Sequence, residues 1–281
     1  MSVKVITDST ADIPAEIMKQ LDITVVPIYV LIGEDSYRDG IDIDSNDLYG
    51  ILDSTPIYPI TSQPNPEDFV SVYTEYADSV DGIVSIHISS GVSGTYNSAV
   101  AAVTGMESTC PIEVIDSRFN SAGLGLIVAA AARLAQSGAT FQKVVEEANK
   151  AVREIGMFGM FEHMKYLARG GRINKTIAAA SQFLNVMPLL TFHDGELARA
   201  GFVRKVENGM NKLYEYVKNN LPVDELVIAH SAVEERANRL RQRLGELVDV
   251  ETIQITELGA SLGVHGGPGV LLVAIRRSAY Y

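Results

Sequence analysis

The sequence predicts an α/β protein of two domains, and three observations carry that prediction. In the first half of the 281-residue chain, β-branched runs alternate with helical patterns, which indicates a parallel sheet covered on both faces. In the second half, Asp194-Gly195 between two strand patterns indicates a hairpin and hence a mixed sheet. The pattern changes near Gly156. We therefore expect a three-layer parallel-sheet domain over residues 1–156 and a two-layer mixed-sheet domain over 157–281.

Each element of the first domain follows from an apolar run and its stop signal. A first strand over Val3–Thr7 ends at Asp8, and a second apolar region, Ile23–Leu31, is interrupted by Pro27. Two prolines make Thr61–Pro66 a rigid loop, because each restricts itself and the residue before it. Further strands are expected over Ile83–Ile88 and Ile112–Ile115. Helices are expected from Pro14, from Asp44 through Leu52, after Pro66, near Ser93, over 121–137 and over 140–154.

The second domain begins with a short strand over Phe158–Phe161 and a helical turn that ends in a basic glycine pair at Gly170-Gly171. Two hairpin strands and a second α/β unit follow. The remaining elements are expected as strands over Val186–Phe192, Glu196–Val203, Leu226–Ala229, Glu251–Thr256 and Val270–Ile275, with helices near 206–219 and 233–247. His265 is expected in a glycine-rich loop before the last strand, where glycines let the backbone approach a ligand closely.

The most informative segment is the turn that follows the strand Ile83–Ile88. It is rich in glycine and hydroxyl residues and leads into a helix near Ser93. Ligands of open α/β sheets lie beyond the carboxyl ends of the strands, and a helix N-terminus attracts anions. Ser93, Gly94 and Thr95 would then donate hydrogen bonds to an anion. An ordinary helix cap explains the same segment equally well.

Composition excludes several classes of protein. The net charge of −12 argues against sequence-independent nucleic-acid binding, which needs a basic face. The longest uncharged apolar run, Ala122–Ala132, is too short to span a bilayer, and no signal peptide is visible. Cys110 is the sole cysteine, which excludes an internal disulfide and fits a reducing cytoplasm. We expect a cytoplasmic protein without a transmembrane segment.

The usual motifs of metal and nucleotide chemistry are missing from the sequence. The five histidines are scattered without ligand spacing, and Walker A is absent, as is GxGxxG between a strand and a helix. Gly91–Thr95 carries threonine where a GxSxG nucleophile elbow needs its last glycine. We therefore expect no metal and no cofactor, and no ATP chemistry by this chain alone.

Seven short motifs follow one another along nearly the whole chain. They are Thr7–Asp12, Thr61–Pro64, Ser93–Tyr96, Ile115–Ser117, Arg169–Ile173, Asp194-Gly195 and His265–Gly269. Each is weak alone, but in this order and spacing they resemble the DegV family, which includes fatty-acid-binding subunits of bacterial fatty acid kinases. The resemblance implies a long-chain fatty acid between the domains, with its carboxylate at the interface and its tail in the N-terminal domain. It also implies a separate ATP-using fatty acid kinase that phosphorylates the carboxylate, for phospholipid synthesis.

A buried carboxylate needs donors at short range, because an unpaired buried charge is very costly. With the resemblance, we expect Thr61, Ser93 and His265 to converge on the carboxylate. Ser62, Gly94 and Thr95 are second-rank candidates, which would either donate or cap. The helix over Ala122–Ala132 consists largely of small residues, which indicate tight packing more often than space for an acyl tail.

Four basic residues are noticeable in this acidic chain: Arg169, Arg172, Arg204 and Lys205. Their ordinary interpretation is a solvated surface with weak ion pairs. The resemblance implies instead a patch that docks the kinase or meets the phosphate of the product, a role that suits the arginine fork. The sequence has Ala168 where the family often carries a basic residue, which weakens the docking interpretation without affecting the fold.

Two other functional classes are consistent with the same residues. One is a small-molecule hydrolase with Ser93 as nucleophile and His265 as base, although such a serine needs an oriented base and an elbow geometry. The other is a structural regulator without a ligand. We favour a lipid-binding carrier that is not itself an enzyme, and this hypothesis leaves transient contact with a membrane surface open.

Overall fold

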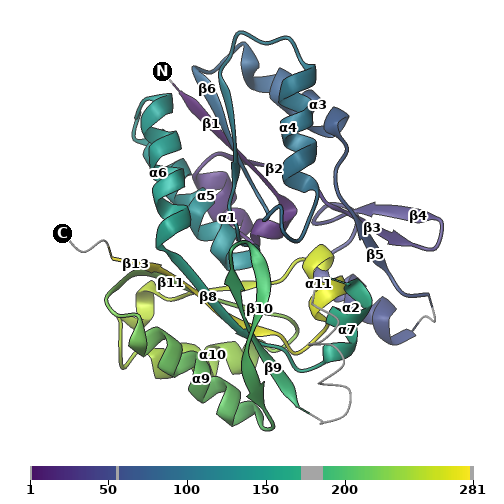
Figure 1. Ribbon diagram of the computed structural model, residues 1–281, viewed down its shortest axis with the longest axis vertical. Helices are drawn as coiled ribbons and strands as arrows, with labels where there is room; N and C mark the ends of the chain where they lie inside the picture. Colours follow the sequence, from purple (N-terminus) through teal and green to yellow (C-terminus); the bar gives the residue numbers. More distant parts are fainter. Residues whose placement is uncertain (1, 55–56, 172–185, 279–281) are drawn as a thin grey trace.

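The N-terminal half is built on a parallel sheet of four strands in the order β2-β1-β6-β7 (Figure 1). The structure is a computed structural model that describes residues 2–54, 57–171 and 186–278. The strands are β1 (Val3–Asp8), β2 (Ile23–Val26), β6 (Gly82–His87) and β7 (Ile112–Asp116). The helices are α1 (Ala15–Gln20), α3 (Pro66–Ala77), α4 (Thr95–Gly105), α5 (Ser121–Gln136) and α6 (Phe141–Glu154), with a 3-10 turn over Ser9–Ala11.

Helices cover both faces of this sheet, as the alternation of strands and helices predicts. Successive residues of a strand point to opposite faces. Val5 and Val84 pack in the core shared with α5 and α6, whereas their neighbours Ile6 and Ile83 pack with Phe69 in the core under α3 and α4. The three-layer parallel arrangement is thus confirmed.

The C-terminal half is built on a mixed sheet of six strands in the order β10-β9-β8-β13-β11-β12. Its strands are β8 (Ile155–Met160), β9 (Met187–His193), β10 (Glu196–Val203), β11 (Val223–His230), β12 (Gln254–Glu257) and β13 (Leu271–Arg277). Its helices are α7 (Met164–Gly170), α9 (Val206–Asn219), α10 (Glu234–Leu244) and α11 (Ala260–Gly266), with a 3-10 turn over Val250–Thr252. The hairpin β9–β10 and the mixed character of the sheet are confirmed, because only β11 and β12 pair in parallel. The sheet begins at Ile155, beside the expected change at Gly156, although a boundary between two domains there stays a prediction.

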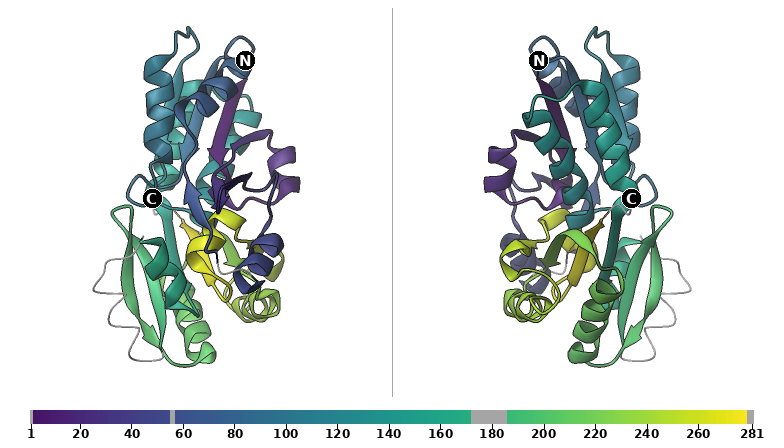
Figure 2. Two further views of the ribbon diagram at one scale, coloured as in Figure 1. Left: turned by 90° about the vertical axis from the view of Figure 1, so that its right-hand side faces the viewer. Right: turned by 90° about the vertical axis from the view of Figure 1, so that its left-hand side faces the viewer.

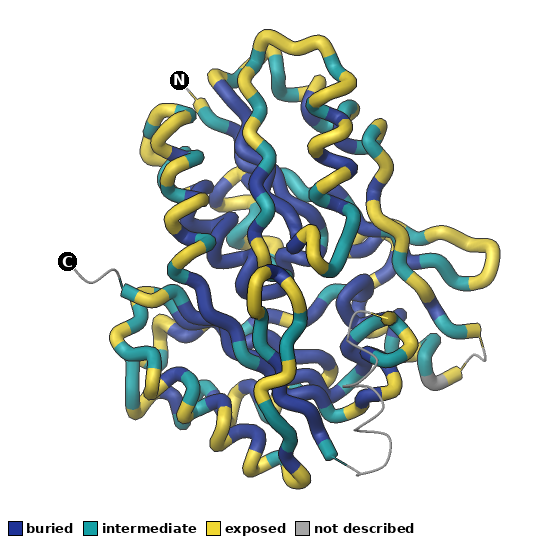
Figure 3. Tube along the Cα trace, viewed as in Figure 1, coloured by how far each residue is buried: buried dark blue, intermediate teal, exposed yellow. Residues whose placement is uncertain are grey.

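The helix α5 lies between the two sheets and joins their cores. One face of the mixed sheet packs on α9 and α10, while Val227 and Leu272 of the other face share a core with α5. All residues from Ser121 to Ala132 are buried, and Figure 3 shows this helix in dark blue at the centre. A Cβ atom at Gly125 would lie 2.6 Å from the carbonyl oxygen of Ala11. The small residues of α5 therefore serve tight packing.

A third sheet of three antiparallel strands, β4-β3-β5, was not predicted. It consists of β3 (Tyr29–Ile32), β4 (Asp35–Arg38) and β5 (Ile60–Ser62), and α2 (Ser45–Ser54) lies between β4 and β5 along the chain. Val30, Leu48 and Val264 share a small core, so this part of the N-terminal half packs against α11 of the C-terminal half. Figure 2 shows the two halves stacked along the long axis, with the small sheet and α2 next to α11 at one side.

Three local expectations were wrong. Thr61 belongs to the strand β5 rather than to a loop, because it pairs with Val30. His265 lies in the last turn of α11 rather than in a loop. The segment expected as one strand over Glu251–Thr256 divides into a 3-10 turn and β12. Among the described residues, no helix is long and apolar enough to cross a membrane.

Candidate functional site

A largely apolar cavity lies between the two sheets. Its empty volume, which includes space open to solvent, is about 750 Å³. Both halves of the chain contribute to it, at the carboxyl ends of β1 and β6 and along α11. The lining residues are Thr10, Ile28, Thr61, Ile88, Val92, Ser93, Asn120, Ser121, Met157, Phe161, Leu167, Leu197, Leu258, Ser261, Leu262, His265, Gly266 and Leu272.

Thr61, Ser93 and His265 all line this cavity, although they come from three distant segments. Thr61 Oγ1 and His265 Nε2 are 2.8 Å apart and share a hydrogen bond between β5 and α11. Ser93 Oγ lies 2.9 Å from Thr95 Oγ1, just before the first turn of α4. The cavity wall thus combines hydroxyl and imidazole groups from both halves, and their convergence on a carboxylate stays a prediction.

The backbone of α7 fixes the other side of the His265 ring. A Cβ atom at Gly170 would lie 2.1 Å from His265 Nδ1, so only glycine allows the ring to approach this closely. The first glycine of the basic pair therefore has a packing role beside the cavity.

The second-rank candidates Ser62, Gly94 and Thr95 are not among the residues that line the cavity. Thr95 is buried and shares a hydrogen bond with the Ser93 hydroxyl, which orients that group. Gly94 precedes α4, and a Cβ atom there would lie 2.0 Å from Gln63 Oε1. The segment around Gln63 and the turn before α4 therefore approach each other closely. Ser62 is exposed, and its Oγ lies 3.4 Å from the backbone oxygen of Gln63.

The basic residues are separated from one another. The Arg169 guanidinium lies 4.9 Å from the ring centre of Tyr58, and Tyr58 donates a 2.6 Å hydrogen bond to the carbonyl of Val264, next to His265. Arg204 lines a separate surface hollow before α9, and the exposed Lys205 follows it. Arg172 lies outside the described residues. Arg169 is therefore the basic candidate that the structure connects with the cavity wall.

Three carboxylates lie directly behind the cavity wall: Asp8 and Asp12 belong to the Thr7–Asp12 motif but were given no role in the site, and Asp39 was not predicted at all. The wall hydroxyls of Thr10, Ser121 and Ser261 each donate a 2.5 Å hydrogen bond to a buried aspartate. The acceptors, in the same order, are Asp8, Asp12 and Asp39. Burial raises the pKa of Asp12 to about 8, although hydrogen bonds from Ser121 and Gly259 oppose that shift. Burial also raises the pKa of Asp39.

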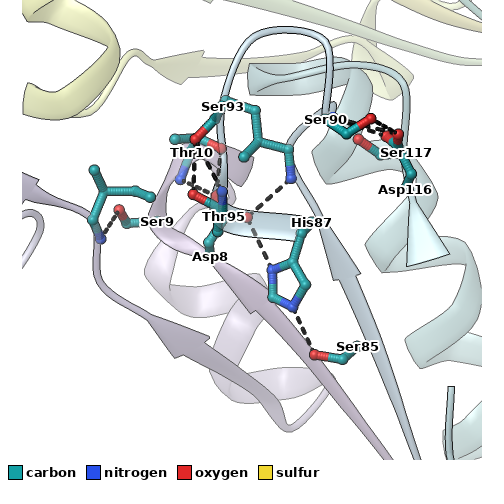
Figure 4. Close-up of polar contacts among 12 residues, drawn as sticks. Asp8, Ser9, Thr10, Ser85, His87, Ser90, Ser93, Thr95, Asp116 and Ser117 are labelled. Atoms are coloured by element: carbon teal, nitrogen blue, oxygen red, sulfur yellow. Dashed lines mark hydrogen bonds and ion pairs between the residues drawn. The ribbon is translucent and has the colours of Figure 1, made fainter. Parts of the chain in front are cut away.

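Asp8 belongs to a closed network inside the parallel sheet (Figure 4). Its Oδ2 accepts hydrogen bonds from His87 Nδ1 and from the Ile88 backbone, both at 3.0 Å. His87 Nε2 lies 2.7 Å from Ser85 Oγ, which also accepts a hydrogen bond from Tyr73. The side chains of Asp8 and His87 are fully buried. The order Asp–His–Ser resembles a catalytic triad, but its full burial makes it a structural network.

β1 and β7 each end in an Asp-Ser step, Asp8-Ser9 and Asp116-Ser117, and together these steps form a polar rim at one edge of the sheet. Figure 4 shows Asp8 and Asp116 at strand ends on the same side of the sheet, with Asp116 accepting a hydrogen bond from Ser90. Ser117 stabilises the next turn, where its hydroxyl donates to the carbonyl of Phe119. This rim shapes the loop that leads to Ser93.

The site geometry bears on the hydrolase alternative and on metal binding. A hydrolase would need Ser93 to donate to His265, whereas Ser93 Oγ pairs with Thr95 and His265 Nε2 pairs with Thr61. Within residues 2–54, 57–171 and 186–278, no group of His, Cys, Asp and Glu could hold a metal ion. The arrangement suits an acceptor-rich polar group attached to a long apolar body.

Comparison with known proteins agrees with this arrangement. A DegV domain-containing protein of Caldanaerobacter subterraneus subsp. tengcongensis is 34% identical over 95% of either chain. A Thermus thermophilus DegV family protein, whose structure is described as fatty acid binding, superposes with a TM-score of 0.91 at 30% identity and covers 99% of this chain and 100% of its own.

The structure of DegV from Bacillus subtilis, described as a fatty acid binding protein, gives a TM-score of 0.88 at 28% identity, over 99% of this chain and 100% of its own. The model of the DegV family of uncharacterised proteins matches residues 2–277. This chain therefore belongs to the DegV family.

Proposed function

We propose that this protein binds a long-chain fatty acid, with the carboxylate at Thr61, Ser93 and His265 and the acyl chain in the apolar part of the cavity. The observation that carries the proposal is that these three polar groups, two of them in contact, line a single cavity whose other lining side chains are mostly apolar. Each buried methylene contributes about 0.8 kcal/mol, so the chain supplies most of the affinity and the polar wall fixes the orientation. The likeness to two relatives described as fatty acid binding supports the same ligand class.

Mass spectrometry of lipid extracted from the purified protein tests this proposal. We expect about one fatty acid per chain in the wild type and clearly less in Ser93→Ala. Ser62→Ala is the matched control, because Ser62 is an exposed hydroxyl residue outside the cavity lining. A wild-type protein that retains and rebinds no fatty acid would overturn the proposal, and equal retention in Ser93→Ala would exclude Ser93 as a ligand.

We further propose that the protein acts in the cytoplasm as a carrier that presents the carboxylate to a separate kinase, for acyl-phosphate formation in phospholipid synthesis. In this proposal residues 1–156 form the domain expected to hold the acyl tail and residues 157–281 close the carboxylate site, and the tail also contacts the second segment, since Met157, Leu197 and Leu258 line the cavity. The sequence lacks a phosphate-cradling loop, so the kinase supplies ATP, Mg²⁺ and the catalytic groups. Arg169, Arg172, Arg204 and Lys205 are the candidates for docking, and Arg169 lies beside the cavity wall.

Reconstitution with a fatty acid kinase from the same organism tests the carrier role. Arg172→Glu combined with Arg204→Glu is expected to leave fatty-acid binding intact and to reduce acyl-phosphate formation, with less salt dependence of what remains. Normal phosphorylation of the fatty acid would exclude these residues from docking. Acyl-phosphate formation by this chain with ATP and no kinase would overturn the carrier role itself.

A further inference from the structure

The helix α11 presents one face to the cavity. Ser261, Leu262, His265 and Gly266 line the cavity, and residues four apart lie one above the other on a helix. Ser261 in the first turn and His265 in the last turn therefore share that face. Because α11 has seven residues, whatever fixes its first turn also sets the position of the imidazole.

Two buried carboxylates of the N-terminal half accept the first hydrogen bonds of α11. The helix begins after Gly259, which has no side chain to cap it. The Gly259 backbone donates to Asp12 Oδ1 at 2.9 Å. The Ser261 hydroxyl donates to Asp39 Oδ2 at 2.5 Å, and the backbone groups of Ala260 and Ser261 face the same carboxylate, where they act to lower its pKa.

The two carboxylates differ in the donors that they receive. Asp39 Oδ2 accepts hydrogen bonds from two hydroxyls, that of Ser261 on α11 and that of Ser9 at 2.8 Å, and the backbone at the start of α11 faces the same carboxylate. A group in these surroundings must accept with both oxygens, which a carboxylate can do and an amide, with its NH₂ end, cannot. The side chain of Asp12 accepts from Ser121 and Gly259, so an amide, with one acceptor and one donor end, satisfies the same two partners.

The remaining contacts of Asp39 connect it rigidly to the cavity wall. Its own backbone donates to the carbonyl of Ile28 at 2.9 Å, and Ser9 accepts from the backbone of Ile28 at 3.0 Å. Ile28 itself lines the cavity. Asp39 is thus held on the N-terminal half at two points while it accepts from the helix of the C-terminal half.

We propose that Asp39 is a positioning residue, which holds the first turn of α11 and thereby places His265 against Thr61 for recognition of the ligand carboxylate. Its effect on ligand binding rests on the proposed function, whereas its effect on His265 does not. Asp39 touches no ligand in this account, since it lies behind the wall that Ser261 forms.

The test compares Asp39→Asn with Asp12→Asn, the same chemical change on the neighbouring carboxylate. The first readout uses ligand-free protein with ¹⁵N-labelled histidine, in which His265→Gln identifies the His265 signals. In wild type, Thr61→Val is expected to shift these signals, because it removes the partner of His265 Nε2. We expect Thr61→Val to cause the same shift when it is combined with Asp12→Asn, and no shift when it is combined with Asp39→Asn. Retention of the full shift in Asp39→Asn would overturn the proposal.

The second readout is palmitate affinity. We expect a loss of about tenfold or more in Asp39→Asn and of less than about threefold in Asp12→Asn. Equal losses in the two variants would overturn the proposal. If wild type binds no palmitate, the proposed function fails, and the histidine signals still decide the role of Asp39.

A gentler pair of variants covers the case in which Asp39→Asn does not fold. Ser261→Ala and Ser9→Ala each remove one hydroxyl donor from the same Asp39 oxygen, but only Ser261 lies on α11. We expect Ser261→Ala to move the His265 signals of ligand-free protein more than Ser9→Ala does. Equal or opposite effects would contradict positioning through α11.

Discussion

Two histidine sites of this molecule pair an imidazole with a hydroxyl group, one inside a sheet and the other on a cavity wall. His87 in β6 and His265 in α11 each share a hydrogen bond with a hydroxyl group through Nε2, at 2.7 Å and 2.8 Å. His87 is fully buried, and its Nδ1 bonds to Asp8 within the same sheet. His265 lies on a cavity wall, and its hydroxyl partner comes from the other half of the chain.

The difference shows how burial separates a structural polar network from a binding one. A network closed inside a sheet stabilises the fold, because its donors would otherwise be buried without partners. The pair on the cavity wall is the one that we propose binds the ligand carboxylate. Changes in the first region should therefore affect folding, and changes in the second should affect ligand binding.

The largest expected effect is the loss of stability in Asp8→Ala. The substitution leaves donors of His87, Ile88 and Thr10 buried without their acceptor. We expect a decrease of about 3–5 kcal/mol in the free energy of unfolding, measured by urea denaturation. Asp116→Ala, at the equivalent Asp-Ser step of β7 but only half-buried, is the control and should lose clearly less. Similar losses in both variants would argue against the closed network.

The next largest effect is expected on ligand affinity, at the Thr61–His265 pair of the cavity wall. Thr61→Val keeps the shape of the side chain but removes the hydroxyl that pairs with His265. We expect fatty-acid affinity to weaken by about 1.5–3 kcal/mol, while the free energy of unfolding changes by less than about 1 kcal/mol. Calorimetric titration with palmitate measures the affinity. If Thr61→Val lost stability but kept its affinity, the pair at His265 would have a structural role rather than a binding role.

The pH dependence of stability reports a third environment, that of Asp12. Its pKa is about 8 in the folded protein against an ordinary value of 3.8, so the folded protein binds more protons than the unfolded chain between these values. Stability should therefore fall as pH rises through this window, by at most about 1.4 kcal/mol per pH unit from this group.

The asparagine of Asp12→Asn cannot titrate, so the stability of this variant should fall less steeply as pH rises. Some pH dependence remains from Asp39, because burial raises its pKa too. Urea denaturation at intervals from pH 5 to pH 8 measures the slope. An unchanged slope in Asp12→Asn would show that Asp12 is ionised throughout the range.

The smallest effects on the isolated protein are expected from two arginines at the surface. Arg169→Glu and Arg204→Glu should each change stability by less than about 0.5 kcal/mol, since both side chains are exposed. They should differ in kinase coupling, because Arg169 contacts the ring of Tyr58 beside the cavity wall and Arg204 lines a separate hollow. Acyl-phosphate formation in a reconstituted pair compares them. A stronger defect in Arg204→Glu would place the docking surface away from the cavity.

Local patterns predicted most elements because the signals are local. The strand over Ile83–Ile88 and the Asp194-Gly195 hairpin depend on neighbouring residues, and both were found within a residue or two. The convergence of Thr61, Ser93 and His265 came from the family resemblance, and the structure brings all three to one cavity.

What could not be predicted depends on contacts between distant residues. Ser261 and Asp39 are 222 positions apart, and Gly259 and Asp12 are 247 apart, so neither carboxylate has a local signal. The same contacts explain the error at His265. The glycines after it favour a loop, but carboxylates from the other half satisfy the first turn of α11 and stabilise a short helix that local propensity does not.

The position of α5 limits how ligand preference can diverge among related sequences. The helix is packed between two sheets, so a larger side chain at Gly123 or Gly125 would collide with Phe119 or with the backbone of Ala11. Of its residues, only Ser121 reaches the cavity. Under the proposed function, differences in acyl-chain preference would therefore arise on the opposing walls, at positions such as Leu197 and Leu258, and not on α5.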